Sequence, residues 1–153
     1  LMSEFLTPMT ELIHDHRGTI DKYMGDAVMC FWGAPLRDPE HALRAILCAL
    51  DMVAAVHALA PKFRERGWPP ITIGVGVNTG EMHVGDMGSR FRRAYTVLGD
   101  AVNLGSRLEG KTKDYGVDII VSETVRAAAR GTGLAFRELD RIIVKGKHEP
   151  VTI

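Results

Sequence analysis

The longest apolar stretch of the chain, from Ala42 to Ala60, is the feature that most constrains the fold. The segment 38–40, Asp-Pro-Glu, precedes it, and acidic residues with proline are typical of the first turn of a helix. Arg44, Asp51 and His57 interrupt the stretch, and charged groups inside a membrane are costly. We therefore predict a core helix that covers a sheet, in preference to a membrane span.

Helical and strand patterns alternate along the rest of the chain. An apolar stripe at helical spacing covers residues 1–16 and ends near Gly18. Two hairpins are predicted, one at residues 20–35 with its turn at Met24 and Gly25, and one at residues 71–85 that turns at 78–80. Further segments are predicted as a basic loop (89–93), a helix from Asn103 onward, a strand (117–122), a helix (123–130) and a strand (136–144). Helices that alternate with hairpins indicate an α+β fold.

Composition indicates one globular domain with a real core. The chain has 153 residues, of which 46% are apolar and 25% charged, and its formal net charge is zero. With no net charge, a large polyanion such as nucleic acid is not an obvious partner, whereas a small nucleotide needs only a local positive pocket. Cys30 and Cys48 lie in apolar segments outside any metal-binding spacing, which predicts buried, reduced thiols and a cytoplasmic location.

The best functional clue is the pair Asn103 and Arg107, which follows an apolar strand-like run and a Gly-Asp turn. A spacing of four residues places both side chains on one face of a helix, one turn apart. An amide can hydrogen-bond a sugar oxygen, and a guanidinium can form a fork onto a phosphate. The pair therefore suits a nucleotide that reacts at phosphorus.

A second clue is the Gly25-Asp26 turn between two apolar runs. Asp26 offers the hard oxygen ligand that Mg²⁺ prefers, and Lys22 stands just before it on the incoming strand.

These segments resemble the class III adenylyl and guanylyl (nucleotidyl) cyclase catalytic domain, and the resemblance covers residues 1–153. The matching segments, in the family's order, are GTIDKYMGDAVM (18–29), GVGVNTG (74–80), YTVLGDAVN (95–103), SRLE (106–109) and VKGK (144–147). The resemblance implies a ferredoxin-like βαββαβ sandwich core with additional strands and helices. It also implies conversion of a nucleoside triphosphate to a 3′,5′-cyclic monophosphate and pyrophosphate.

The resemblance also implies a role for each matching residue. Asp26 matches the second of two aspartates that hold two Mg²⁺ or Mn²⁺ ions. Asn103 matches the residue that orients the ribose, Arg107 the one that stabilises charge on the α-phosphate, and Lys145 the one that holds pyrophosphate.

The remaining two matches concern the base. Lys22 and Thr96 match the positions that read it: an ammonium can donate to an adenine ring nitrogen, and a threonine hydroxyl can accept from the adenine amine. Guanine presents the reverse pattern, and similar guanylyl cyclases carry an acidic residue at the position of Lys22. We therefore predict ATP as the substrate, and an adenylate cyclase.

The family's first metal-binding aspartate lies in a Phe-x-Asp type motif that this sequence does not contain. We expect that strand and its carboxylate upstream of Leu1, and regulatory domains elsewhere in a full-length protein, free in the cytoplasm or attached to a membrane. The resemblance further implies a homodimer with shared active sites, in which Asp26 comes from one chain and the other site residues from its partner.

Other functions remain open at this stage. They are a guanylate cyclase, against which Lys22 and Thr96 argue, and a catalytically inactive dimerisation or nucleotide-sensing domain. An RNA-binding module would need exposed strand aromatics in an RNP1-like pattern and a basic sheet face, and the sequence predicts neither.

Overall fold

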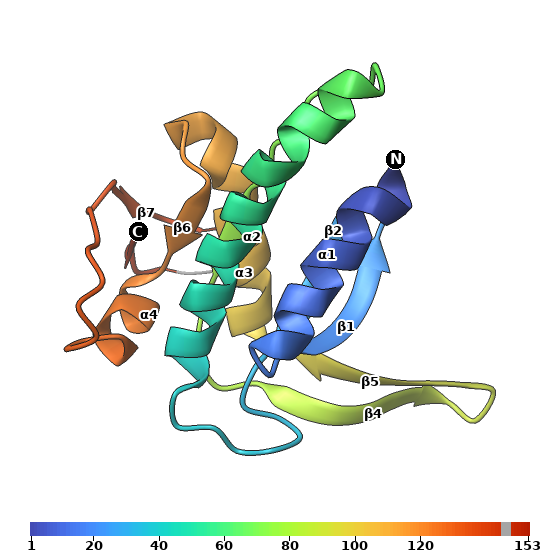
Figure 1. Ribbon diagram of the computed structural model, residues 1–153. Helices are drawn as coiled ribbons and strands as arrows, with labels where there is room; N and C mark the ends of the chain where they lie inside the picture. The colour runs from blue at the N-terminus through green and yellow to red at the C-terminus, as the bar shows by residue number, and fades with distance from the viewer. Residues whose placement is uncertain (145–147) are drawn as a thin grey trace. The chain divides into compact units, whose positions relative to one another are not determined.

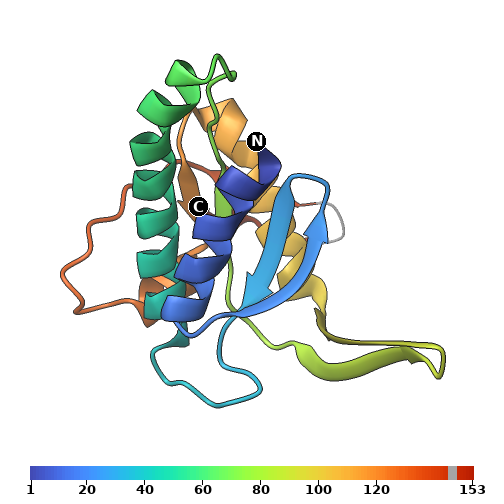
Figure 2. The same ribbon diagram turned by 45° about the vertical axis from the view of Figure 1, so that its right-hand side comes forward.

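The computed structural model describes residues 1–144 and 148–153, and the chain divides into two compact units, Leu1–Ile73 and Gly74–Ile153. Helices account for 41% of the structure and strands for 23%, which confirms the α+β class. Figure 1 and Figure 2 show the elements from two directions. In chain order they are α1 (Met2–Asp15), β1 (Thr19–Met24), β2 (Ala27–Phe31), α2 (His41–Glu65), β3 (Val75–Val77), β4 (His83–Ser89), β5 (Arg92–Leu98), α3 (Asp100–Tyr115), β6 (Ile119–Val121), α4 (Glu123–Ala128), β7 (Arg141–Ile142) and β8 (Val151–Thr152).

The first unit is built on two helices that lie side by side, α1 and α2 (Figure 1). Phe5 and Met9 of α1 form a buried cluster with Val56 and Phe63 of α2, as the helical spacing of their apolar residues requires. The predicted helices are both confirmed. Helix α2 continues past the predicted end at Ala60 to Glu65, although Pro61 lies inside it.

Helix α2 is also long and apolar enough to cross a membrane by length and composition, the one such helix among the described residues. One third of its most apolar window is buried within the structure. Its packing against α1 is what the prediction of a core helix requires. Cys48 of α2 also lies near enough to Cys30 of β2 to add, after burial, to the rise in the pKa of the Cys30 thiol.

The first predicted hairpin is present as β1 and β2, but its turn lies one residue later than expected. Met24 pairs with Ala27, so Gly25 and Asp26 are the two turn residues. Gly25 has φ 61°, a left-handed conformation that glycine adopts without steric cost. Type I′ and type II′ turns have a positive φ at their first central residue, and their twist matches the right-handed twist of the two strands.

The second predicted hairpin is wrong. Strand β3 does not pair with the segment after Asn78; it pairs in parallel with β6, with Val75 opposite Ile119. Strand β4 pairs with β5 instead, and the segment 89–93 predicted as a loop is the tip of that hairpin and the ends of its two strands. The polar and glycine-rich composition of β4 gives little sign of its full length as a strand. Its backbone hydrogen bonds are made with β5.

Helix α3 packs on the parallel pair of β3 and β6 in the second unit. Leu104 and Leu108 of α3 form a buried cluster with Ile120 of β6 and with Val144 and Ile153. The predicted strand at 136–144 is reduced to β7, which pairs with β8 near the end of the chain. Because Leu104 and Leu108 face the core, the side of α3 away from them is the side that can contact a ligand.

Both cysteines are free thiols, as predicted. Cys48 is fully buried and Cys30 is half-buried. Burial raises the pKa of both thiols to about 12, so neither ionises near neutral pH. A role as a nucleophile is therefore not supported for either residue.

Candidate active site

Helix α3 presents the pair that the sequence singled out. It begins after Gly99, whose carbonyl accepts hydrogen bonds from the backbone N–H groups of Val102 (3.1 Å) and Asn103 (3.4 Å). Leu104 and Leu108 are buried, which fixes the rotation of the helix about its axis. Asn103 is exposed and Arg107 is half-buried, one turn further along.

Arg107 makes no ion pair or side-chain hydrogen bond with any other residue that the structure describes. Arg126 differs, because its guanidinium pairs with Glu123 at 3.1 Å. The five N–H donors of Arg107 are therefore available to an anionic ligand. Among the described residues Asn103 is likewise without a side-chain partner.

Thr96 lies on β5, the strand that leads directly into α3. It is opposite Gly85 in the β4–β5 ladder, and only 8% of it is exposed. Thr96 is thus almost fully buried on that strand.

Lys22 and Asp26 both lie on the β1–β2 hairpin. The ladder slips between Ile20 and Lys22, so that Asp21 is the extra residue of a bulge and Lys22 pairs with Met29. A bulge redirects the side chains that follow it. The Lys22 side chain is 49% exposed, with its Nζ 3.9 Å from a carboxylate oxygen of Asp21.

Asp26, at the tip of the hairpin, is the exposed carboxylate of this segment. Asp21 differs, because its side chain is only 2% exposed and lies beside an ammonium. No group of three or more His, Cys, Asp or Glu side chains that could hold a metal occurs among the described residues. Mg²⁺ commonly uses one or two carboxylates together with substrate phosphates, so Asp26 fits a metal that is held jointly with a nucleotide.

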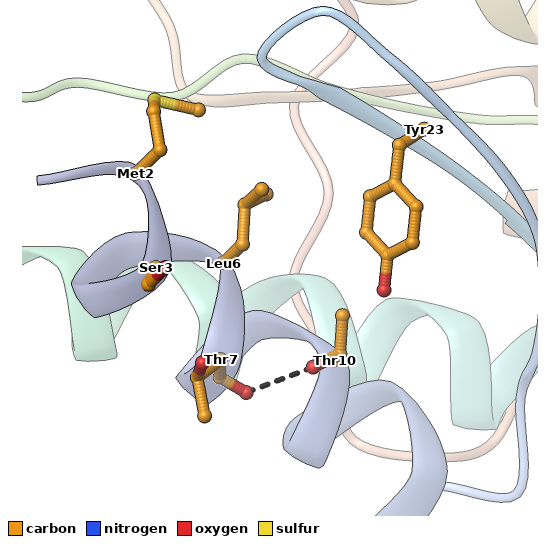
Figure 3. Close-up of a pocket in the computed structure, with 6 residues that line it drawn as sticks. All are labelled: Met2, Ser3, Leu6, Thr7, Thr10 and Tyr23. Atoms are coloured by element: carbon orange, nitrogen blue, oxygen red, sulfur yellow. Dashed lines mark hydrogen bonds between the residues drawn. The ribbon is translucent and has the colours of Figure 1, made fainter.

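The first unit also has a surface hollow of about 270 Å³ between α1 and β1 (Figure 3). Its lining is Met2, Ser3, Leu6, Thr7, Thr10 and Tyr23. No charged side chain lines it, so it offers nothing to neutralise a triphosphate. The candidate active site is therefore not this hollow, although Tyr23 neighbours Lys22 in the chain.

The structure thus places the predicted residues in two groups. Lys22 and Asp26 share a hairpin of the first unit, while Thr96, Asn103 and Arg107 share the β5–α3 segment of the second. Lys145 lies outside the described residues.

Sequence reasoning missed Asn78, which it placed in a turn. The Asn78 side-chain amide donates from Nδ2 to the carbonyl oxygen of Ala101 at 2.8 Å, in the first turn of α3. Its only signal in the sequence was its position just after the Gly74-to-Val77 run, since its partners are distant in the chain.

Known proteins resemble this chain over its whole length. A family model described as the adenylate and guanylate cyclase catalytic domain matches residues 1–153. Adenylate cyclase 1 of Rhizobium meliloti (strain 1021) is 36% identical over 153 residues, which cover 100% of this chain and 23% of that protein. An adenylate cyclase of Anabaena cylindrica is 33% identical over 162 residues, covering 99% of this chain and 30% of the relative. The chain thus spans less than a third of these relatives.

Solved structures agree closely with the fold. The guanylyl cyclase Cya2 matches with a TM-score of 0.90 at 33% identity, covering 99% of this chain and 75% of that one. The adenylyl cyclase CyaB from P. aeruginosa matches with a TM-score of 0.89 at 30% identity, covering 99% of this chain and 77% of that one.

Proposed function

This chain belongs to the family of adenylate and guanylate cyclase catalytic domains, and we propose that it converts ATP to 3′,5′-cyclic AMP and pyrophosphate. The observation that carries the proposal is the pair on α3. Arg107 has no partner among the described residues and lies one turn from the exposed Asn103, on a helix whose opposite face is buried. An unpaired guanidinium on a helix whose rotation is fixed by its buried leucines suits charge that develops on a phosphate.

In the proposed reaction the ribose 3′-oxygen attacks the α-phosphorus and forms a new O–P bond, and the 3′-hydroxyl proton passes to water. The bond from the α-phosphorus to the bridging oxygen breaks, and pyrophosphate departs. Asn103 orients the ribose, and Arg107 stabilises the negative charge on the five-coordinate phosphorus. Lys145 is proposed to hold pyrophosphate, by resemblance alone. Two divalent ions, Mg²⁺ or Mn²⁺, when bound activate the 3′-hydroxyl and neutralise the triphosphate, and Asp26 is the described residue that would bind them.

Lys22 and Thr96 are proposed to select adenine. The half-exposed ammonium of Lys22 can donate to a ring nitrogen that accepts, and the Thr96 hydroxyl can accept from the amine. Guanine would instead present its N1–H donor to the ammonium, which can only donate, so these two donors would be left unsatisfied. For this reason we prefer adenylate cyclase activity over guanylate cyclase activity.

We also propose a cytoplasmic location, where ATP is abundant and thiols stay reduced.

The test is cyclic nucleotide formation by the natural full-length protein with ATP or GTP and Mg²⁺ or Mn²⁺. We expect cyclic AMP to form at least tenfold faster than cyclic GMP. Lys22→Glu combined with Thr96→Cys should reduce kcat/KM for ATP by at least tenfold, because each mispaired hydrogen bond costs about 1–3 kcal/mol.

The matched control is Arg137→Glu, which makes the same charge change at an exposed position outside the site. It should leave the rate with ATP nearly unaltered. Unchanged cyclic AMP formation in the double variant would remove Lys22 and Thr96 from the site, and no cyclic nucleotide from either substrate would favour an inactive sensing domain.

We also propose that the active sites form in a homodimer, each with Asp26 from one chain and Lys22, Thr96, Asn103 and Arg107 from the other. Mixing an Asp26→Ala chain with an Arg107→Ala chain should then restore activity that neither has alone. In a mixed dimer one site collects both lesions and the other has none. With random pairing, half of the dimers are mixed and each has one intact site, so about a quarter of normal activity is the ceiling.

Subunit exchange must be shown independently, for instance by transfer of an affinity tag between the two variants. Exchange without recovery of activity would exclude the shared site and indicate a site within one chain.

A further inference from the structure

The Asn78 side chain joins three elements of the second unit, at the point where β3 ends. Its Nδ2 donates to the carbonyl oxygen of Ala101 in α3 at 2.8 Å. Its Oδ1 accepts from the hydroxyl of Ser122 at 2.5 Å, just before α4 begins, and lies 3.3 Å from the hydroxyl of Thr124. Ser122 is 1% exposed, so this network is shielded from water on that side.

Both ends of the amide are required by their partners. The Ala101 carbonyl can only accept a hydrogen bond, whereas the hydroxyls of Ser122 and Thr124 can donate. A reversed amide would place its oxygen against the Ala101 oxygen. An aspartate of the same shape could satisfy Ser122 but not Ala101, so the asparagine is chemically specific at this position.

The Asn78 amide holds the first turn of α3 through the Ala101 carbonyl oxygen. This bond is not an N-cap, because a cap accepts from the free N–H groups of the first turn, and Gly99 before the helix has no side chain that could do so. The segment that carries Asn78 is packed tightly there, because a Cβ at Gly80 would lie 2.9 Å from the Cβ of Ala101. Ala101 precedes Asn103 by two residues and Arg107 by six, so whatever holds Ala101 also places the start of the functional face.

We infer that Asn78 is a positioning residue for the cyclase reaction: its amide holds the first turn of α3 against the β3–β6 pair and so sets where Asn103 and Arg107 lie. The inference rests on the proposed function of that pair. Asn78 itself touches no reacting atom. Misplacement of a catalytic group by about 1 Å can cost about 10²-fold in rate, which gives the scale of the effect.

The experiment compares Asn78→Asp with Ser122→Ala in the natural full-length protein, using kcat, KM for ATP with Mg²⁺, and melting temperature. Asn78→Asp keeps the acceptor for Ser122 but sets a carboxylate oxygen against Ala101. Ser122→Ala removes the opposite bond, while the bond to Ala101 remains. The Thr124 hydroxyl is then the donor nearest the amide oxygen, at 3.3 Å, and its one proton is shared with the Thr79 carbonyl at 3.2 Å.

We expect Asn78→Asp to lower kcat at least tenfold with KM changed less than threefold. Ser122→Ala should lower the melting temperature by a similar amount but change kcat less than threefold. A structural role alone would make kcat follow the melting temperature equally in both variants, and that result would overturn the inference. So would a kcat for folded Asn78→Asp within threefold of the wild type.

The coupling between Asn78 and Arg107 can also be tested by making Asn78→Asp in the Arg107→Ala background. There Asn78→Asp should lower kcat much less than in the wild type, because the guanidinium that Asn78 positions is gone. Fully multiplicative losses would contradict the inference. If Asn78→Asp does not fold at the assay temperature, Asn78→Ala replaces it under the same criteria.

These outcomes are distinct from failure of the proposed function. That failure would show as a wild type that forms no cyclic nucleotide, or as an Arg107→Ala variant with full activity.

Discussion

Gly76→Ala is expected to destabilise the Gly74–Ile153 unit by about 3 kcal/mol, the upper end of what overpacking usually costs. A Cβ at Gly76 would collide with the backbone nitrogen of Glu109 and the backbone oxygen of Gly105, and would lie 3.0 Å from the Cα of Glu109. All of these atoms belong to the backbone of α3, so no side chain can rotate away. The helix must move or β3 must leave its place beside β6.

Thermal unfolding provides the measurement, and a loss of this size should lower the melting temperature by roughly 6–12 °C. Gly110→Ala is the matched control, because Gly110 lies within α3 and an added Cβ there would meet nothing within 4 Å. Alanine favours a helix over glycine by about 0.8–1.0 kcal/mol, so this variant should be more stable. Equal melting temperatures for the two variants would show that β3 and α3 are not in backbone contact.

The helices could be predicted well, because their signal is local. The apolar stripe of residues 1–16 corresponds to α1, and Phe5 and Met9 on that stripe are buried in the helix pair. The end of α2 was less predictable. Pro61 usually stops a helix, but Phe63 is 2% exposed and packs edge-on against Trp68 at 5.3 Å, which stabilises one further turn.

Strand pairing could not be predicted so well, because the partner of a strand need not be its neighbour in the chain. The asparagine and glycine after β3 favour a tight turn, yet the backbone N–H of Val75 donates to Asp118 at 2.8 Å and that of Ser122 to Val77 at 3.2 Å. These partners lie more than 40 residues along the chain. The local preference for a turn therefore predicted the wrong partner for β3. The strand pairs instead in parallel with β6, and α3 packs on both strands.

The candidate site divides in the same way. The spacing of Asn103 and Arg107 predicted that they share one face of a helix, and the structure confirms the helix. The supporting contact was not predictable, since Asn78 lies 23 residues from Ala101 and 44 from Ser122. A resemblance proposes groups that would act on a substrate, and it does not point to the residues that hold those groups in place.

Arg107→Ala is expected to lower the rate of cyclic AMP formation by about 10²–10³-fold, the usual cost of removing one preorganised charge-stabilising group. The physical reason is that the Arg107 guanidinium has no partner among the described residues, unlike that of Arg126. Its N–H donors can therefore bind the negative charge on the phosphate in the transition state. For the same reason its removal should leave the melting temperature nearly unaltered. Asn103→Ala should behave likewise, since its side chain is exposed.

The control for this prediction is Arg126→Ala on α4, where the guanidinium is paired with Glu123 at 3.1 Å and exposed. It should retain the wild-type rate. Arg107→Lys separates charge from geometry, because an ammonium keeps the charge but loses the planar fork that fits a phosphate. We therefore expect only partial recovery with lysine, measured as kcat with saturating ATP and Mg²⁺. If Arg107→Ala instead unfolds, or keeps its full rate, then Arg107 is a structural residue and the phosphate must be held by another group.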